Sequence, residues 1–255
     1  MDAVLFDLDG VLTDTAALHE RAWKRLLDQY FAELAHRPAP VPFSSADYRR
    51  YVDGRPRVDG LANVLASRGI TLPAGRPGDG PDTTTLHGLA GRKDRYFREL
   101  IETDVPVFPA TRTVLAGLRA HRVPVAVVSA SRNAAAVLAR TGLARWVSVL
   151  VDGHEAERLA LPGKPDPAAF LLAARRLGVP PARAAVVEDA VAGVEAGRRG
   201  GFGLVIGVDR HHQAATLKDA GADLVVTDLA ELEVTGVPGG VRISARPGDP
   251  TPYGP

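Results

Sequence analysis

Short runs of apolar, mostly β-branched residues recur along the chain, and stretches with helical patterning separate most of them. The apolar runs cover residues 3–6, 123–128, 147–151, 184–187, 204–208 and 224–226, and each predicts a buried strand. The helical stretches cover residues 110–120, 133–141, 167–177 and 190–197. Strands that alternate with helices form a parallel sheet covered on both faces. The sequence therefore predicts an α/β fold with a doubly wound, Rossmann-like parallel sheet.

One long segment, residues 15–105, interrupts this alternation. It contains helical patterns over 16–34, 60–67 and 92–102 and no convincing strand, so we expect an inserted all-helical cap domain. The core domain would then comprise residues 1–14 and 106–232. Within the cap, residues 35–45 and 72–82 are rich in proline or glycine and predict surface loops. Residues 233–255 are rich in glycine and proline, which predicts a flexible C-terminal tail.

The charge balance excludes several classes of partner. The 255 residues include 31 basic and 30 acidic ones, for a net charge of +1, so no overall field favours nucleic acid or an anionic membrane. The chain has no cysteine, so a metal site would use oxygen or imidazole ligands. The first residues lead directly into a strand, without a basic leader, and no apolar run approaches the roughly 18 residues of a membrane helix. We expect a cytoplasmic protein, and, since no interface is recognisable, a monomer.

Two carboxylates follow directly on the first predicted strand, in the segment Phe6-Asp7-Leu8-Asp9-Gly10. Open α/β sheets bind their ligands at the carboxyl ends of their strands, so Asp7 and Asp9 are candidates for a site. An Asp-Gly pair is also common in turns. This segment alone leaves open that both residues only shape a turn or cap a helix.

Hydroxyl and backbone N–H groups follow the second predicted strand, in the segment Ser129-Ala130-Ser131-Arg132-Asn133. A helix is predicted to begin here, and a helix N-terminus suits a phosphate. A serine in this place can also act only as an N-cap.

A lysine and a second acidic pair complete the set of candidates in the core. Lys164 lies on the loop before the helix that Pro167 opens, where a lone lysine is more often a solvated surface charge. Glu188 and Asp189 end the fourth predicted strand, and carboxylates from two strand ends can share one hard cation. Mg²⁺ is preferred because few carboxylates, several waters and a substrate phosphate complete its octahedral set. Zinc is a poorer fit without a nearby imidazole.

Four segments occur in a fixed order, each after a predicted strand or before a predicted helix. They are DLDG, VVSAS, GKPDP and VVEDAVAG. In this order they resemble the motifs of the haloacid dehalogenase superfamily. The stretch LFDLDGVLTDT, continued by His19 and the run RAWK, further resembles its β-phosphoglucomutase branch, and so does SASRN. The resemblance covers roughly residues 2–232.

The resemblance implies a covalent mechanism in the core. Asp7 would be the nucleophile that attacks phosphorus and becomes an aspartyl phosphate. Asp9 would be the general acid and base, which requires a carboxyl with a raised pKa that carries the proton when the sugar oxygen departs. A neighbouring anionic Asp7 acts in that direction.

The resemblance also implies the ligands of the cation and of the transferred phosphoryl group. Mg²⁺ would be held by Asp7, the backbone carbonyl of Asp9 and Asp189, with Glu188 close by. The positions implied for the phosphoryl oxygens are Ser129, Ala130, Ser131 and Lys164.

In the cap, the segment GRPR that begins at Gly54 resembles the loop that grips the distal phosphate, and Arg57 matches its arginine, a residue that forks onto phosphate oxygens. Lys93 matches a substrate contact, and His19 a hinge-side residue that senses cap closure. The further substrate and cap positions are Thr15, Trp23, Gly54 and Asn133. Taken singly, His19, Arg57 and Lys93 could also be ordinary exposed helix charges, and this alternative is strongest for His19.

Two departures from the pattern bear on the substrate. Asp94 stands where the branch has an asparagine after the cap lysine, and Arg55 and Pro56 replace polar loop residues. The cap is also longer through residues 35–45 and 72–82, which either decorate the surface or reshape the pocket; the sequence leaves both possibilities open.

Three functions are consistent with these residues. The favoured one is a Mg²⁺-dependent sugar-phosphate phosphomutase that interconverts β-glucose 1-phosphate and glucose 6-phosphate through glucose 1,6-bisphosphate. The alternative is a sugar-phosphate phosphatase with the same core, in which Asp9 activates water. A non-catalytic sugar-phosphate-binding protein is disfavoured because every core position holds a competent residue type.

Overall fold

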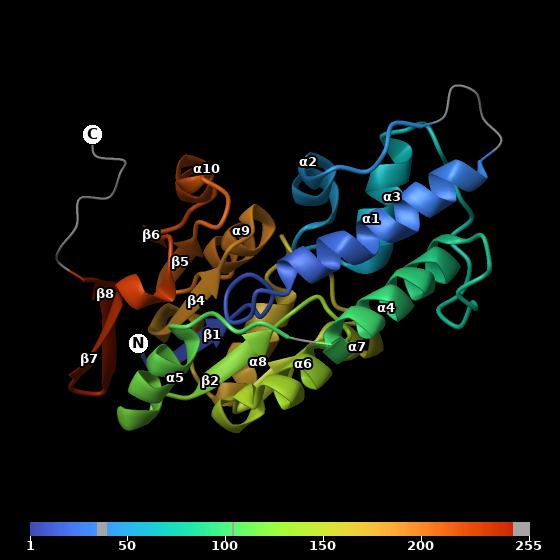
Figure 1. Cartoon of the computed structure of the whole chain (residues 1–255). Coiled ribbons are helices and arrows are strands. Elements are labelled where there is room, and N and C mark those ends of the chain that lie inside the picture. Colours follow the sequence, from blue (N-terminus) through green and yellow to red (C-terminus); the bar gives the residue numbers. More distant parts are fainter. Residues whose placement is uncertain (35–39, 104, 247–255) are drawn as a thin grey trace.

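The computed structural model describes residues 1–34, 40–103 and 105–246. At its centre, six parallel strands lie in the order β3-β2-β1-β4-β5-β6 (Figure 1). These strands are β1 (Ala3–Phe6), β2 (Val125–Val128), β3 (Val149–Val151), β4 (Ala184–Glu188), β5 (Leu204–Val208) and β6 (Leu224–Val226). The predicted doubly wound core is confirmed.

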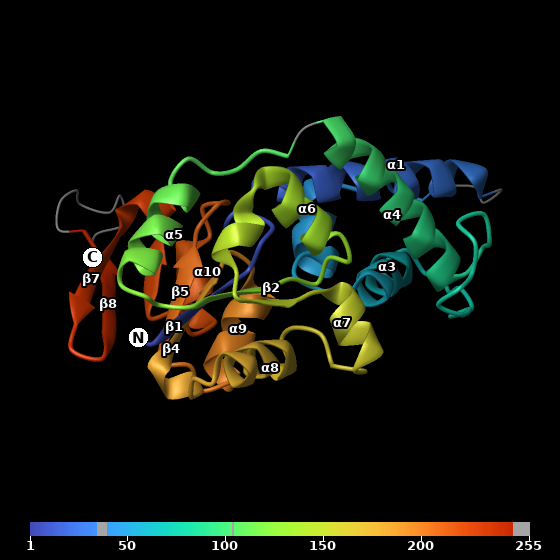
Figure 2. The ribbon, with the colours of Figure 1, turned by 90° about the horizontal axis from the view of Figure 1, so that it is seen from below.

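The helices of the sheet domain lie on both of its faces, as Figure 2 shows. They are α5 (Thr111–Ala120), α6 (Ala134–Thr141), α7 (Gly153–Arg158), α8 (Ala168–Leu177), α9 (Val191–Arg199) and α10 (Ala214–Asp219). Three short 3₁₀ turns, η2 (Leu143–Trp146), η3 (Pro181–Arg183) and η4 (Leu229–Glu231), connect elements.

The alternation of side chains along each strand produces two hydrophobic layers. On β1, Val4 and Phe6 pack with the apolar residues of α5 and α6, whereas Ala3 and Leu5 pack with those of α8, α9 and α10. Since strands buried on both faces need apolar residues at every position, the short continuous runs in the sequence follow from this layering.

The elements between β1 and α5 in the described residues are all helical, and loops connect them. These elements are α1 (Ala16–Glu33), α2 (Ser45–Asp47), the π-helix η1 (Tyr48–Val52), α3 (Arg57–Ala66) and α4 (Leu86–Thr103). The α1 and α4 helices lie side by side in both views (Figures 1 and 2). The two connections to the core also run together, because Thr13 forms β-bridges with Asp9 and Val107.

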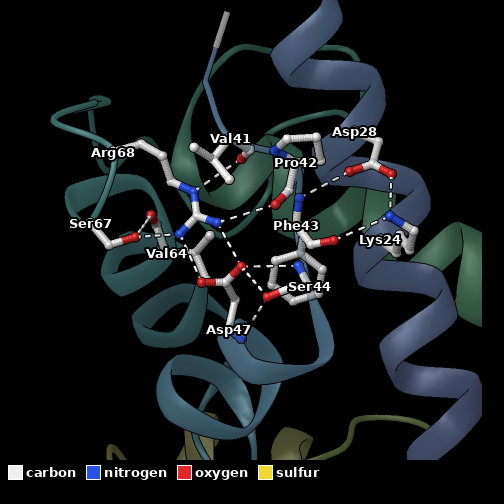
Figure 3. Close-up of polar contacts among 10 residues, drawn as sticks. All are labelled: Lys24, Asp28, Val41, Pro42, Phe43, Ser44, Asp47, Val64, Ser67 and Arg68. Carbon is white, nitrogen blue, oxygen red and sulfur yellow. Dashed lines mark hydrogen bonds and ion pairs between the residues drawn. The ribbon is translucent and has the colours of Figure 1, made fainter.

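Polar contacts tie the segment before α2 to the neighbouring helices (Figure 3). Arg68 Nη2 lies 2.6 Å from Asp47 Oδ2, and Asp28 Oδ1 accepts the Phe43 N–H at 3.1 Å. The last residues of the predicted loop over 35–45 are therefore held by these contacts. Residues 35–39 of that loop lie outside the described part. The predicted loop over 72–82 contains neither helix nor strand.

The prediction of a flexible tail over 233–255 is wrong for residues 233–245. Strands β7 (Leu232–Val237) and β8 (Gly240–Ala245) form an antiparallel hairpin. Val241 is buried, and Val234 and Ile243 pack against the core, so three β-branched side chains supply the apolar contacts that a loose tail would lack. The remainder of the predicted tail, 247–255, lies outside the described residues.

None of the helices in the described part of the chain combines the length and apolar character that crossing a bilayer requires.

Candidate active site

Three strands bring the acidic and hydroxyl residues to one edge of the sheet. Phe6 is in register with Val127 of β2 and with Val187 of β4, so the residues that follow these positions emerge at the same level. The residues predicted for the core site lie together. Seven of them line one cavity: Asp7, Asp9, Ser129, Ala130, Ser131, Glu188 and Asp189. The eighth, Lys164, contacts Asp7.

Lys164 lies at the base of this group. Its Nζ is 2.5 Å from Asp7 Oδ1 and 2.5 Å from Glu188 Oε1, and all three residues are buried. Burial alone would lower the pKa of Lys164, but the charges of Asp7 and Glu188 outweigh it and raise that pKa. The lysine is therefore a buried ammonium held by two carboxylates and not a solvated surface charge.

Asp9 is held by three donors from two segments of the chain. Thr15 Oγ1 donates to its Oδ1, Ser129 Oγ donates to its Oδ2 at 3.1 Å, and His19 Nε2 lies 3.3 Å from Oδ1. Burial would raise the pKa of Asp9, but His19 and these hydroxyls stabilise the charged form and lower the pKa to about 2. The expected raised pKa is thus not found in this conformation, because the donors hold the carboxylate.

His19 links this carboxylate to the cap. Its Nδ1 lies 2.5 Å from Lys93 Nζ, and its ring stacks on Phe97 with the centroids 3.7 Å apart. Burial and the charge of Lys93 lower the pKa of His19. A neutral ring that accepts from Lys93 at Nδ1 carries its proton on Nε2, which then faces Asp9.

Lys93 is itself buried, between His19 and two aromatic rings. Its Nζ lies 5.4 Å from the centroid of Trp23 and 4.7 Å from that of Phe97. Burial and the nearby charge of Arg57 lower the pKa of Lys93 to about 7. The reading of His19 and Lys93 as ordinary exposed charges is therefore wrong.

Arg57 and Asn133 approach the same cavity from opposite sides, and Asp94 lies between them. Asp94 Oδ1 is 2.8 Å from Arg57 Nη1 on α3 and accepts from Asn133 Nδ2 in the core at 2.7 Å. Arg57 has a side chain that is only 17% exposed, so it is not a solvated surface charge either. The departure at Asp94 thus lies within the site.

Asp189 lies over Gly10, next to Asp9. A Cβ atom on Gly10 would fall 1.8 Å from Asp189 Oδ2, so glycine is required for this approach. Burial and the charges of Asp53 and Glu188 raise the pKa of Asp189 well above its usual range. Among the described residues, Asp189 forms no ion pair.

This donor set fits Mg²⁺. No group of three or more His, Cys, Asp or Glu side chains in the described residues forms a metal site by itself. Mg²⁺ characteristically takes only one or two carboxylates and completes its shell with water and substrate phosphate. Asp7 and Asp189, with the backbone carbonyl of Asp9, would supply such a set.

The cavity that these residues line is small. Its volume is about 60 Å³, far below the roughly 300 Å³ at which ligand pockets begin. A ligand of that size can therefore enter this cavity only when the cap moves away from the core. A neighbouring cavity of about 340 Å³ shares Ser129 and Lys164 with the site, and Pro77 and Asp79 of the long cap loop line it.

Three cap residues of the cavity, Tyr48, Val52 and Asp53, were neither predicted for the site nor named as departures. Asp53 faces Asp189, and burial together with the charge of Glu188 raises the pKa of Asp53 to about 7. An Asp-Gly pair at residues 53–54 was the only sequence signal, because the contact between cap and core depends on tertiary packing.

Comparisons with known proteins agree with this geometry. A family model described as haloacid dehalogenase-like hydrolase matches residues 1–201. A beta-phosphoglucomutase of Mycobacterium tuberculosis is 50% identical over 237 residues, which cover 90% of each chain. A phosphorylated carbohydrates phosphatase of Thermotoga maritima is 30% identical over 233 residues, or 89% of this chain and 94% of that protein.

Among solved structures, a crystal structure of beta-phosphoglucomutase from Clostridium difficile superimposes with a TM-score of 0.75 at 25% identity. The match covers 91% of this chain and 93% of that one.

Proposed function

We propose that this chain, which belongs to the haloacid dehalogenase-like hydrolase family, is a Mg²⁺-dependent phosphomutase that interconverts β-glucose 1-phosphate and glucose 6-phosphate. One observation carries the proposal: cationic groups lie at both ends of the site. Lys164 lies beside Asp7 in the core, and Arg57 and Lys93 lie in the cap. A sugar bisphosphate held between them can be turned around and still find a partner for each phosphate.

The reaction would use Asp7 as the group that accepts and returns the phosphoryl group. In the first half-reaction, a hydroxyl oxygen of the sugar monophosphate attacks the phosphorus on phosphorylated Asp7, and Asp9 accepts the hydroxyl proton. The bond from Asp7 to phosphorus breaks, which yields glucose 1,6-bisphosphate. After the bisphosphate turns, an oxygen of Asp7 attacks its other phosphorus, and Asp9 returns the proton to the departing sugar oxygen.

Asp9 must leave its present partners for this chemistry. Bound to His19, Thr15 and Ser129 it is a carboxylate with a low pKa, so it has no proton to donate and is only a weak base. Rotation toward the substrate removes these donors, so its pKa rises and it can carry the proton.

Lys164 and the cation would balance charge around the phosphoryl group. The Lys164 ammonium and the hydroxyl of Ser129 lie at the phosphate end of the site and would stabilise the non-bridging oxygens. Mg²⁺ bound by Asp7, Asp189 and the Asp9 carbonyl would supply a Lewis acid that neutralises phosphoryl charge. Closing the cap to a small cavity would exclude water, to which the aspartyl phosphate is sensitive.

A phosphatase acting on sugar phosphates is the second candidate. The Thermotoga maritima relative is named as a phosphatase, and Asp94 lies on the arginine that a second phosphate would need. In that reaction water replaces the sugar hydroxyl and every core residue keeps its role.

One experiment distinguishes the two candidates. The protein is given Mg²⁺, β-glucose 1-phosphate and a trace of glucose 1,6-bisphosphate, and glucose 6-phosphate and inorganic phosphate are measured together. The mutase proposal requires glucose 6-phosphate to accumulate, with little inorganic phosphate, and requires the activity to disappear with EDTA and return with Mg²⁺. Stoichiometric inorganic phosphate would replace the mutase by the phosphatase, and full turnover by Asp7→Asn would exclude both.

A further inference from the structure

We propose that Asp94 is an internal competitor of the distal phosphate: its carboxylate occupies Arg57 and Asn133 when no phosphate lies there, and it thereby weakens binding of a second phosphate group. This inference rests on the proposed function, which places the distal phosphate at Arg57. It assigns to Asp94 a role in specificity, namely discrimination against substrates that carry a second phosphate.

The contacts of Asp94 place an anion at the position where a distal phosphate would bind. A single oxygen, Oδ1, lies 2.8 Å from Arg57 Nη1 and 2.7 Å from Asn133 Nδ2. One donor belongs to the cap and the other to the core, so the carboxylate bridges the two domains. Both are groups that recognise phosphate oxygens well.

Burial makes the competition strong. The side chains of Arg57 and Asp94 are 17% and 16% exposed, so water screens their charges poorly. A phosphate dianion that approaches Arg57 meets the negative charge of Asp94 at close range. It must share the arginine or displace the carboxylate, and either event reduces its net binding free energy.

The structure also provides a place for the displaced carboxylate. Asp94 Oδ2 lies 3.4 Å from Arg98 Nε, one turn further along α4, and the Arg98 side chain is 60% exposed. Asp94 can therefore give up its partner inside the cavity and keep an exposed partner that does not line it. Such an exchange would let the bisphosphate bind loosely enough to turn between the half-reactions.

The test measures binding without turnover. Asp7→Asn removes the nucleophile, and in this background calorimetry gives the Kd of glucose 1,6-bisphosphate and of β-glucose 1-phosphate, both with Mg²⁺. Adding Asp94→Asn should tighten the bisphosphate about tenfold relative to the monophosphate, within the range of typical coupling between charged groups. Asp82→Asn removes a cap charge on a side chain that is 84% exposed and should leave this ratio unchanged.

A second variant has the opposite expected sign. Arg98→Gln removes the partner that draws Asp94 away, so the bisphosphate should bind roughly two- to fivefold more weakly. If Asp94→Asn leaves the ratio unchanged, or weakens both ligands equally as loss of a simple domain contact would, the inference is wrong. These binding constants do not depend on whether the active enzyme transfers the phosphoryl group to sugar or to water. Failure of the mutase proposal would instead appear in the product assay described above.

Discussion

Lys164 Nζ lies 2.5 Å from Asp7 Oδ1 at the base of the active site, and both side chains are buried. The same ammonium contacts Glu188 at 2.5 Å. One buried cation therefore balances two buried carboxylates, and the candidate nucleophile is part of a structural ion network as well as of the chemistry.

Replacement of this lysine should damage both stability and activity. Lys164→Met leaves Asp7 and Glu188 without their counterion, and breaking a buried pair typically costs about 3 kcal/mol or more. Asp7→Asn keeps the pair between Lys164 and Glu188, so its stability should change by only about 1 kcal/mol, although turnover should fall by roughly 10⁴-fold. Urea unfolding and product assays measure the two effects. Equal stability of the two variants would contradict the structural role of Lys164.

Gly10 and Gly178 form a matched pair for testing the position of Asp189. Both have positive φ, +89° and +70°, but a Cβ on Gly10 would collide with Asp189 whereas nothing lies within 4 Å of one on Gly178. Both alanine variants should lose about 1 kcal/mol of stability from backbone strain. Only Gly10→Ala should also raise the Mg²⁺ concentration needed for half-maximal activity. Equal Mg²⁺ dependence in the two variants would show that Asp189 is not held as described.

The low pKa of Lys93 predicts a dependence of stability on pH. Its pKa is about 7 in the folded protein against an ordinary value of 10.5, so between these values the unfolded chain binds a proton that the folded chain does not. The free energy of unfolding should therefore rise with pH over this window, by up to about 1.4 kcal/mol per pH unit. Below pH 7, where both states are protonated, the contribution is constant.

Lys93→Met isolates this contribution because it removes the titrating group and keeps an apolar side chain beside the aromatic rings. The difference in unfolding free energy between the wild type and this variant, from urea titrations at pH 6, 7.5 and 9, should increase with pH. Parallel curves would contradict the lowered pKa.

Val241 tests the hairpin that replaced the expected tail. Its side chain is 1% exposed, whereas that of Val237 in the same hairpin is 37% exposed. Val241→Ala should reduce stability by about 1–2 kcal/mol, and Val237→Ala should have little effect. Thermal unfolding of both variants gives the comparison, and an unaffected Val241→Ala would favour a loosely attached hairpin.

Most of the sheet could be predicted because buried parallel strands produce short apolar runs. The second strand nevertheless begins at Val125 and not at residue 123, since Pro124 has no N–H to give to the ladder. The helix α4 begins at Leu86, six residues before the predicted start at 92. The prediction missed these residues because Gly88 and Gly91 lower the helical propensity of the first turns.

The hairpin was missed for a different reason. Glycine and proline are abundant in residues 233–255, and only three β-branched residues, Val234, Val241 and Ile243, anchor the hairpin. Their burial depends on a surface that the rest of the fold supplies, and composition does not reveal such a surface.

The core of the site was accessible to prediction because strand ends of a parallel sheet meet at one edge. The protonation states of its side chains could not be predicted from the sequence. Asp9 has a low pKa because His19 and Thr15, at the start of α1, and Ser129, after β2, converge on it. The approach of Asp53 to Asp189 likewise arises only when the cap lies on the core.

The register of the sheet restricts how such a chain can vary. Phe6 is level with Val127 and Val187, so a one-residue deletion within β1 or β4 would turn Asp7 or Glu188 toward the opposite face of the sheet. Replacement of side chains at this edge is therefore expected to be tolerated better than a change in the number of residues in these strands. Insertions are expected to accumulate instead in the cap loops, where no neighbouring strand fixes the spacing.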